Sequence, residues 1–319
     1  MANDLLSAFI HLNLAAAGAI LAVLAIRPLV RRHFGPAIAY RVWLCVPIAA
    51  VTALFPAAAA TRIVPPGDGP HFDPLYVASQ GLMHAPTHML AGLWLAGALT
   101  AAGLIALCQL RFLDMARRGL AGPAVAGVFA PRIVMPADAD ALYSPEERAL
   151  IRAHERTHID RGDPRTNGLI ALAQCLCWFN PVVHLAAREA RLDQELAGDA
   201  MVLAHRPTQK RRYAETLLKT QLGGVAAPLG CHWLAGSAPH PLEQRIAALR
   251  RPTPDYRRQD IGAFVMAGVI AIAAFGAWRA QPDATPEGVA PDYVPVVKEM
   301  RHMQAIIVKP VHSPSFIPG

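Results

Sequence analysis

The chain has 319 residues, of which 54% are hydrophobic and 17% are charged, and its mean hydropathy is +0.29. A soluble enzyme of this length carries more charge, so the composition excludes an ordinary soluble domain and indicates a membrane protein. The net charge of +7 suits a surface beside anionic lipid headgroups, and because no nucleic-acid-binding motif accompanies it, direct nucleic-acid binding is not expected.

Four long apolar runs predict membrane-spanning helices. They cover residues 5–26, 42–60, 89–110 and 261–278. Each run is near the roughly 20 residues that cross a bilayer. Pro47 and Pro56 interrupt the second run, which spanning helices tolerate. Arginines follow the first run rather than precede it, so it is predicted to span the membrane and not to act as a signal peptide.

Arginines between the runs predict the orientation of the chain. Four arginines and no acidic residue lie in residues 27–41, and further arginines follow the third run and precede the fourth. Because cytoplasmic loops carry an excess of basic residues, both termini are predicted to lie outside the inner membrane. The predicted domains are three spans in 1–110, a cytoplasmic domain in 111–260, a fourth span in 261–278 and a short extracytoplasmic tail in 279–319.

A short stretch with the pattern of β-strands precedes the segment that contains His154 and His158. Residues 123–136 read PAVAGVFAPRIVMP, with Gly and Pro at turn positions. A hairpin of this kind can be purely structural, or its free edge can take up an extended peptide by β-augmentation. The sequence leaves both roles open.

A predicted helix start is followed by a histidine pair. Ser144 stands at the N-cap, with Pro145 at the first helical position and Glu147 at the third, which is a capping box. The helix that follows carries His154 and His158, which are four residues apart. They therefore project from one face, where both imidazoles can bind one metal ion.

The pattern H-E-x-x-H predicts a catalytic zinc site. Zinc takes neutral imidazole nitrogens and, in a catalytic site, keeps three protein ligands and one position for water. Glu155 follows the first histidine, so its carboxylate can lie beside the open position, take a proton from water and pass it to a leaving amine. The predicted cofactor is Zn²⁺, with Glu155 as the catalytic residue.

The third zinc ligand is expected in the helix that follows the sequence WFNP. Two acidic pairs in this helix have i, i+4 spacing: Glu189 with Asp193, and Glu195 with Asp199. Periodicity alone does not choose between the pairs. A surface ion pair between Glu195 and Arg191 is the alternative that involves no metal.

Three motifs together carry a family resemblance. The segments HERTHIDRGD and WFNP and the D-x-E-x-x-x-D run from Asp193 to Asp199 resemble the BlaR/MecR-type bacterial membrane zinc metallopeptidases, an antirepressor and signal-transducer family. The likeness covers residues 5–278 in layout and is most specific in residues 127–199. It implies that Glu195 completes the zinc site with His154 and His158, and that Asp199 supports the site from behind the ligands.

Several positions near the motif extend or depart from the family pattern. Asp163 matches an acidic position of the family, where it would hydrogen-bond the far nitrogen of a ligand histidine, or else it is a surface charge. Pro164 is unusual there and predicts that the motif helix ends or kinks. Gly198 and His184 also depart from the pattern, and His184 is interpreted as a histidine partnered within the protein.

Residues 168–187 form a fifth apolar run. If this run crossed the membrane, Glu195 and His154 would lie on opposite sides and could not share one zinc ion. The run is therefore predicted to be a buried or membrane-dipping helical pair that turns at Asn180 and Pro181.

The cysteines and the tail carry no further site. The five cysteines lie in apolar runs or in the predicted cytoplasmic domain, so no disulfide is expected. The resemblance includes relatives with a large penicillin-binding sensor domain, but the tail is too short for one and the chain contains no S-x-x-K motif.

The predicted fold is a mainly α membrane protein with four transmembrane helices and a cytoplasmic gluzincin-like zinc metallopeptidase region that contains a short β-hairpin or edge strand. By resemblance, it is an endopeptidase that cleaves a cytoplasmic protein, such as a winged-helix transcriptional repressor, in signal-induced gene expression. Membrane lipids and a second copy of the chain are the other expected partners. Two alternatives are a quality-control protease of the HtpX type and a non-catalytic signal relay with structural zinc.

Overall fold

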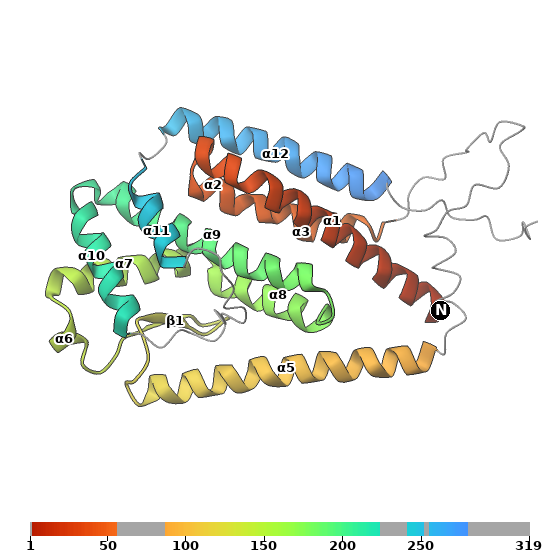
Figure 1. Ribbon diagram of the computed structural model, residues 1–319, viewed down its shortest axis with the longest axis horizontal. Helices are drawn as coiled ribbons and strands as arrows, with labels where there is room; N and C mark the ends of the chain where they lie inside the picture. Colours follow the sequence, from red (N-terminus) through yellow and green to blue (C-terminus); the bar gives the residue numbers. More distant parts are fainter. Residues whose placement is uncertain (1, 56–86, 224–240, 252–254, 280–319) are drawn as a thin grey trace, which may run out of the picture. The chain divides into compact units, whose positions relative to one another are not determined.

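The computed structural model describes residues 2–55, 87–223, 241–251 and 255–279. These residues belong to one structural unit that is mainly helical and contains a two-stranded sheet (Figure 1). Except for Arg279, which ends the last described helix, the predicted extracytoplasmic tail lies outside the described residues.

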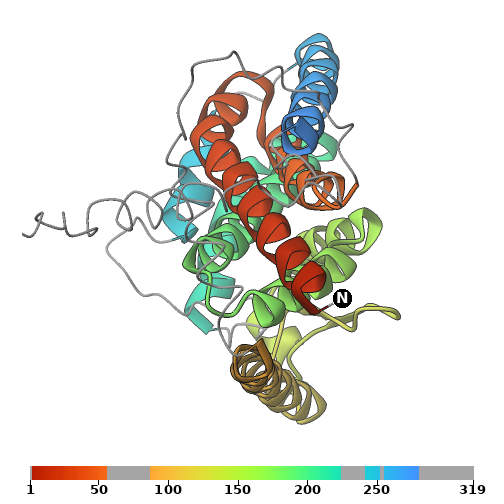
Figure 2. The ribbon, with the colours of Figure 1, turned by 90° about the vertical axis from the view of Figure 1, so that its right-hand side faces the viewer.

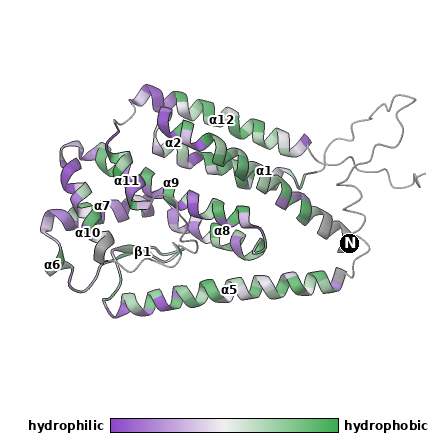
Figure 3. Ribbon diagram, viewed as in Figure 1, coloured by the Kyte–Doolittle hydropathy of each residue, from purple (hydrophilic) through white to green (hydrophobic). Residues whose placement is uncertain are grey.

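Three helices are long and apolar enough to cross a membrane: α1 (Ala2–Phe34), α5 (Thr87–Arg117) and α12 (Tyr256–Arg279). Large apolar side chains on all three are more than half exposed, among them Leu14, Leu99 and Phe264. Figure 3 shows hydrophobic residues along each of these helices. Such exposure is costly in water and expected in lipid, so the first, third and fourth predicted runs form candidate spans.

The second predicted run has a different structure. Its described part contains a 3-10 turn (Val42–Leu44) and α3 (Cys45–Thr52). Together with α2 (Pro36–Arg41), which precedes the run, they form an apolar segment shorter than a span. Residues 56–60 of the predicted run lie outside the described residues. The part of the chain that the structure describes therefore contains three candidate spans, whereas the hydropathy of the sequence predicts four.

The membrane helices α1, α3 and α12 pack side by side (Figures 1 and 2). Their shared core contains Val23, Val30, Val42, Cys45 and Met266. α12 approaches the end of α1 so closely that a Cβ atom on Gly262 would lie 2.8 Å from Phe34 Cβ. Glycine is needed at this contact because any side chain there would force the two helices apart.

The remaining described elements surround α9 (Pro181–His205). They are α6 (Ala139–Leu142), α7 (Pro145–Arg161), α8 (Asp163–Leu176), a 3-10 turn (Pro207–Gln209), α10 (Lys210–Gly223) and α11 (Pro241–Leu249). α9 contacts α1, α2, α7, α8 and α11, and 13 of its 25 residues are buried. It is thus the element that joins the membrane helices to the rest of the unit.

The predicted β-hairpin is confirmed. β1 (Ala124–Ala126) and β2 (Arg132–Val134) are antiparallel, with Val125 opposite Ile133, and both strands contact α7. The hairpin therefore lies directly beside the helix that carries the histidine motif.

The start and end of α7 follow the sequence prediction. The Ser144 side chain accepts a hydrogen bond from Glu147 N, and Glu147 in turn accepts one from Ser144 N, which completes the capping box. α7 ends at Arg161, because Gly162 takes the left-handed conformation (φ 74°, ψ 22°). Pro164 lies in the first turn of α8, so the motif helix ends just before it.

The fifth apolar run is a helical pair, as predicted. α8 ends at Leu176, and α9 begins after Asn180, whose side chain accepts a hydrogen bond from Val182 N. The turn between the helices packs on α5, where the Trp178 indole donates to the Trp94 carbonyl at 3.1 Å. The pair is therefore joined to a candidate span.

Candidate metal centre

Three of the predicted site residues meet where α7 and α9 pack together. His154 and His158 project from α7 and Glu195 from α9, and their ligand atoms lie within 4.8 Å of one another. The two Nε2 atoms are 3.1 Å apart. Glu195 Oε2 lies 3.2 Å from His154 Nε2, and Glu195 Oε1 lies 3.6 Å from His158 Nε2.

These separations fit the donor set of a tetrahedral metal ion. Bonds of about 2.0–2.1 Å at tetrahedral angles place two ligand atoms about 3.3 Å apart. The measured distances of 3.1, 3.2 and 3.6 Å lie close to this value. Two imidazoles and one carboxylate with this geometry can bind a metal and leave one position free.

The far nitrogens of both histidines are held by the protein. His158 Nδ1 donates to Asp163 Oδ2 at 2.7 Å. His154 Nδ1 lies 2.8 Å from the Tyr213 hydroxyl, which donates to Asp199 Oδ1 at 2.6 Å and so accepts from the imidazole. With both Nδ1 atoms acting as donors, the Nε2 lone pairs point toward the common position, as in metal-binding histidines generally.

Asp163 is a buried carboxylate and not a surface charge, because its exposed fraction is 1%. Arg161 donates to Asp163 Oδ2 through both Nε and Nη2. Although burial opposes ionisation, the hydrogen bonds from His158 and Arg161 hold the pKa of Asp163 below its ordinary value. The ionised carboxylate can therefore fix the orientation of the His158 ring.

Glu155 lies beside the cluster on α7. Burial raises the pKa of its carboxyl above the ordinary value, while the neighbouring His154 and His158 act in the opposite direction. A carboxyl with a raised pKa is better matched to accepting and returning a proton near neutral pH. The position and chemistry of Glu155 thus suit general acid–base catalysis.

Arg245 of α11 is part of the cluster, and the sequence did not predict it. Its guanidinium Nη1 lies 2.8 Å from Glu195 Oε2, and Nε and Nη2 donate to Asp199 at 2.9 and 2.7 Å. Desolvation opposes ionisation of Glu195, but Arg245 and His158 hold the pKa of this carboxyl well below its usual range. Glu195 is therefore available as an ionised ligand.

Arg245 and Tyr213 lie in the segment that the sequence suggested to be a basic, solvated face. Lys210, Arg211 and Arg212 are indeed exposed, but Tyr213 and Arg245 are buried. Only one sequence signal marks Arg245: it lies on the stripe of α11 that also carries Leu242 and Leu249, the second of which is buried. A charged residue on an apolar stripe needs a buried partner.

The acidic pair of Glu189 and Asp193 faces away from the cluster. Arg27 of α1 forms ion pairs with Glu189 and Asp193, and the Trp43 indole donates to Asp193 Oδ2 at 2.9 Å. Glu189 and Asp193 therefore bind a membrane helix, whereas Glu195 and Asp199 join the histidines. Arg191 donates to the Gln174 amide at 3.1 Å, while Glu195 pairs with Arg245.

His184 is partnered within the protein. Its Nδ1 lies 3.2 Å from the Gln174 amide nitrogen, and its Nε2 lies 3.0 Å from the Trp178 carbonyl. These contacts use both ring nitrogens, so His184 is accounted for without a metal.

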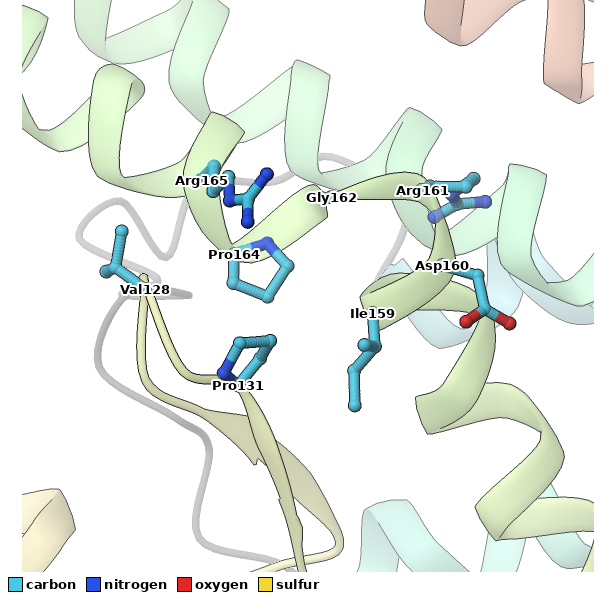
Figure 4. A pocket seen from close by; sticks show the side chains of 8 residues that line it. All are labelled: Val128, Pro131, Ile159, Asp160, Arg161, Gly162, Pro164 and Arg165. Atoms are coloured by element: carbon cyan, nitrogen blue, oxygen red, sulfur yellow. The ribbon is translucent and has the colours of Figure 1, made fainter.

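A cavity of about 300 Å³ opens between the tip of the hairpin and the turn from α7 to α8 (Figure 4). Its lining residues are Val128, Pro131, Ile159, Asp160, Arg161, Gly162, Pro164 and Arg165. Ile159 lies four residues after Glu155 and thus on the same stripe of α7. The cavity therefore lies beside the end of α7, one turn beyond Glu155 along the helix.

Comparison with known proteins identifies the family. The family model for the BlaR1 peptidase M56 matches residues 7–117 and 111–249, which is well over half of the chain. The regulatory protein BlaR1 of Bacillus licheniformis is 32% identical over 98 residues, a stretch that covers 30% of this chain and 16% of that protein. No solved structure matches the chain. The chain belongs to the BlaR1 peptidase M56 family.

Proposed function

We propose that this chain is a multi-pass inner-membrane zinc endopeptidase that cleaves a cytoplasmic regulator, such as a transcriptional repressor, during signal-induced gene expression. The observation that carries the proposal is the cluster of His154, His158 and Glu195 with Glu155 beside it. The family match supports peptidase activity, and the name of the Bacillus licheniformis relative supports a regulatory role.

Zinc would be held by His154, His158 and Glu195. Two imidazoles and one carboxylate are a donor set that zinc takes in catalytic sites, and the distances between the three residues suit its bond lengths. When bound, zinc supplies Lewis acidity, which polarises a peptide carbonyl and makes water a stronger acid. A structural site has no use for a glutamate at its open position, so Glu155 argues against a non-catalytic relay.

The chain's own residues move the proton and hold the ligands. Glu155 takes a proton from the attacking water and gives it to the nitrogen of the leaving amine. Asp163 fixes the ring of His158, and Tyr213 together with Asp199 fixes the ring of His154.

Substrate binding is proposed to use the hairpin and the cavity beside α7. An extended peptide can pair with a free strand edge through main-chain hydrogen bonds, and its side chains then project alternately to either side. The cavity beside the end of α7 is lined by Val128, Pro131, Ile159 and Pro164 together with Asp160, Arg161 and Arg165, so it is proposed to take a substrate side chain that is partly apolar and partly polar.

The proposed topology has four spans, of which the second is the apolar run of residues 42–60. The arginines of residues 27–41 support a cytoplasmic position for the junction of α1 and α2. Because α2 contacts α9, which carries Glu195, the metal cluster is proposed to lie on that side as well. The helical pair of α8 and α9 would then dip into the bilayer beside α5, which seats the site at the membrane surface.

Metal analysis with an activity assay tests the proposal. The full chain, purified in lipid nanodiscs, is expected to contain one zinc per chain and to cleave a protein from a cytoplasmic extract. A chelator should abolish both the zinc content and the cleavage, and zinc but not magnesium should restore them. Absence of zinc from the purified chain, or cleavage that persists in the chelator, would contradict the proposal.

A further inference from the structure

A tyrosine from the membrane region reaches the back of the metal cluster. The Tyr40 hydroxyl donates to Asp163 Oδ1 at 3.1 Å and accepts a hydrogen bond from Gln194 Nε2 at 2.9 Å. Asp163 holds His158 through its other oxygen, and Gln194 directly precedes Glu195 in α9. One hydroxyl therefore contacts the aspartate that holds His158 on α7 and the residue that precedes Glu195 on α9.

Arg161 closes this network around the tyrosine. Its guanidinium lies over the Tyr40 ring, 5.4 Å from the ring centroid. The same guanidinium donates to Asp163 and to the Gln194 carbonyl, the latter at 2.8 Å. Both ends of the Tyr40 side chain are thus fixed against the groups that orient His158.

The position of Tyr40 depends on the membrane helices. It lies in α2, which follows α1 through Gly35 at φ 90°. Arg27 of α1 and Trp43, just after α2, both bind Asp193 of α9. These contacts flank Tyr40 in the sequence, so the packing of α1 and α2 on α9 decides where its hydroxyl lies.

We propose that Tyr40 is a positioning residue of the metal centre. By donating to Asp163, it holds the carboxylate in the orientation that aligns the His158 imidazole, so that a residue between two membrane helices controls metal affinity and turnover. The inference rests on the proposed function, because it requires the cluster to bind metal.

The test is Tyr40→Phe, which removes the hydroxyl and keeps the ring beneath Arg161. Zinc affinity, measured in nanodiscs by competition with a chelating dye, is expected to fall about tenfold, since partners of this kind tune metal sites by 10- to 100-fold. The kcat of cleavage should fall while KM changes little, because the hydroxyl aligns a ligand and does not touch the substrate. Tyr143→Phe is the matched control, since this ring packs in the separate cluster with Ala139 and Ile151.

A double-mutant cycle separates positioning from general stabilisation. If Tyr40 acts through Asp163, then Tyr40→Phe should weaken zinc binding much less in an Asp163→Asn background than in the unaltered chain. The visible spectrum of the cobalt-substituted protein should also shift in Tyr40→Phe and remain unchanged in Tyr143→Phe. Equal effects of Tyr40→Phe in both backgrounds would overturn the inference.

The outcomes distinguish this inference from the function on which it rests. If the unaltered chain binds zinc and His158→Ala does not, the metal site stands. Unaltered zinc affinity and cobalt spectrum in Tyr40→Phe would then overturn the role of Tyr40 alone. If the unaltered chain binds no zinc, both the proposed function and the role of Tyr40 are overturned.

Discussion

Two acidic pairs of the same chemistry and spacing lie on α9 and face different neighbours. Glu189 and Asp193 bind Arg27 of the membrane helix α1. Glu195 and Asp199, six residues further along, bind Arg245 and lie beside His154. Six residues correspond to about 240° around a helix, so the two pairs lie on different sides of α9.

The two acidic pairs differ in the groups that surround their carboxylates. Around Glu189 and Asp193, Arg27 and the Trp43 indole are the nearest donors, with Arg31 and Arg188 slightly further away, so this group joins α1 to α9. Around Glu195, one arginine faces two imidazoles, and a place for a cation remains among the donor atoms. Two pairs with the same residue types and spacing therefore have different roles. Glu189 and Asp193 join α9 to α1, whereas Glu195 and Asp199 are proposed to belong to a metal site.

Removal of one glutamate from each pair should give the largest contrast. Glu195→Ala is expected to weaken zinc binding more than about 1000-fold, because it removes a proposed direct ligand rather than a support. Glu189→Ala should keep the zinc affinity of the unaltered chain. Zinc content after dialysis measures both, and loss of zinc in both variants would show that the two pairs are not functionally distinct.

Variants that lack Arg27 or Arg245 should differ in how much zinc restores their stability. Arg27→Met removes the nearest cation of Glu189 and Asp193, although Arg188 and Arg31 remain 3.7 and 3.8 Å from these carboxylates. Arg245→Met removes the arginine that pairs with Glu195 and Asp199. Removal of one partner of a buried ion pair typically costs about 3–5 kcal/mol of unfolding free energy. Saturating zinc should stabilise every variant that binds it. It should narrow the difference in stability between Arg245→Met and the unaltered chain, since the bound ion neutralises Glu195, and leave the corresponding difference for Arg27→Met unchanged. Denaturant unfolding with and without zinc measures this, and equal narrowing of both differences would contradict the account.

Substitution of the aspartates should also affect zinc affinity in one pair and not in the other, but by less than substitution of the glutamates. Asp199→Asn is expected to weaken zinc binding about 10- to 100-fold, because the carboxylate supports His154 through Tyr213. Asp193→Asn is the matched change in the other pair and should leave zinc affinity unaltered. If Asp199→Asn binds zinc as tightly as the unaltered chain, Asp199 does not support the site.

Substitution of the N-cap residue Ser144 should have the smallest effect, and it should change stability without changing zinc affinity. Ser144→Ala removes the N-cap of α7 and is expected to cost about 1 kcal/mol of unfolding free energy. Ser144→Asp should retain most of that stability, because aspartate also caps helices. Zinc affinity should be the same in both variants, since the cap lies ten residues before His154, and a loss of affinity in either would argue against this independence.

The parts of the site that depend on local spacing could be predicted from the sequence. Two histidines at i, i+4 and a capping box upstream of them define a helix and one face of it. Glu195 needed the family resemblance, because spacing alone fitted Glu189 equally well. The partners that decide between the two pairs, Arg27 and Arg245, come from distant helices, and no local pattern specifies which carboxylate they reach.

The helices of the fold could likewise be predicted only where a local property of the sequence defines them. Hydropathy predicted the runs that form α1, α5 and α12, because the apolar composition of a long helix is a local property. It did not predict the break around the 3-10 turn Val42–Leu44, which leaves Tyr40 in a short helix against α9. That break depends on packing, and it places the Tyr40 hydroxyl beside Asp163.

The most direct test of the central claim is to compare the unaltered chain with Glu155→Gln in membranes, with zinc content and cleavage of cytoplasmic proteins measured together. The substitution keeps the size of the side chain and removes its ability to accept a proton. The account predicts that Glu155→Gln retains one zinc per chain and loses a specific cleavage that the unaltered chain performs. Zinc binding with no cleavage that depends on Glu155 would contradict the claim that this is a catalytic centre.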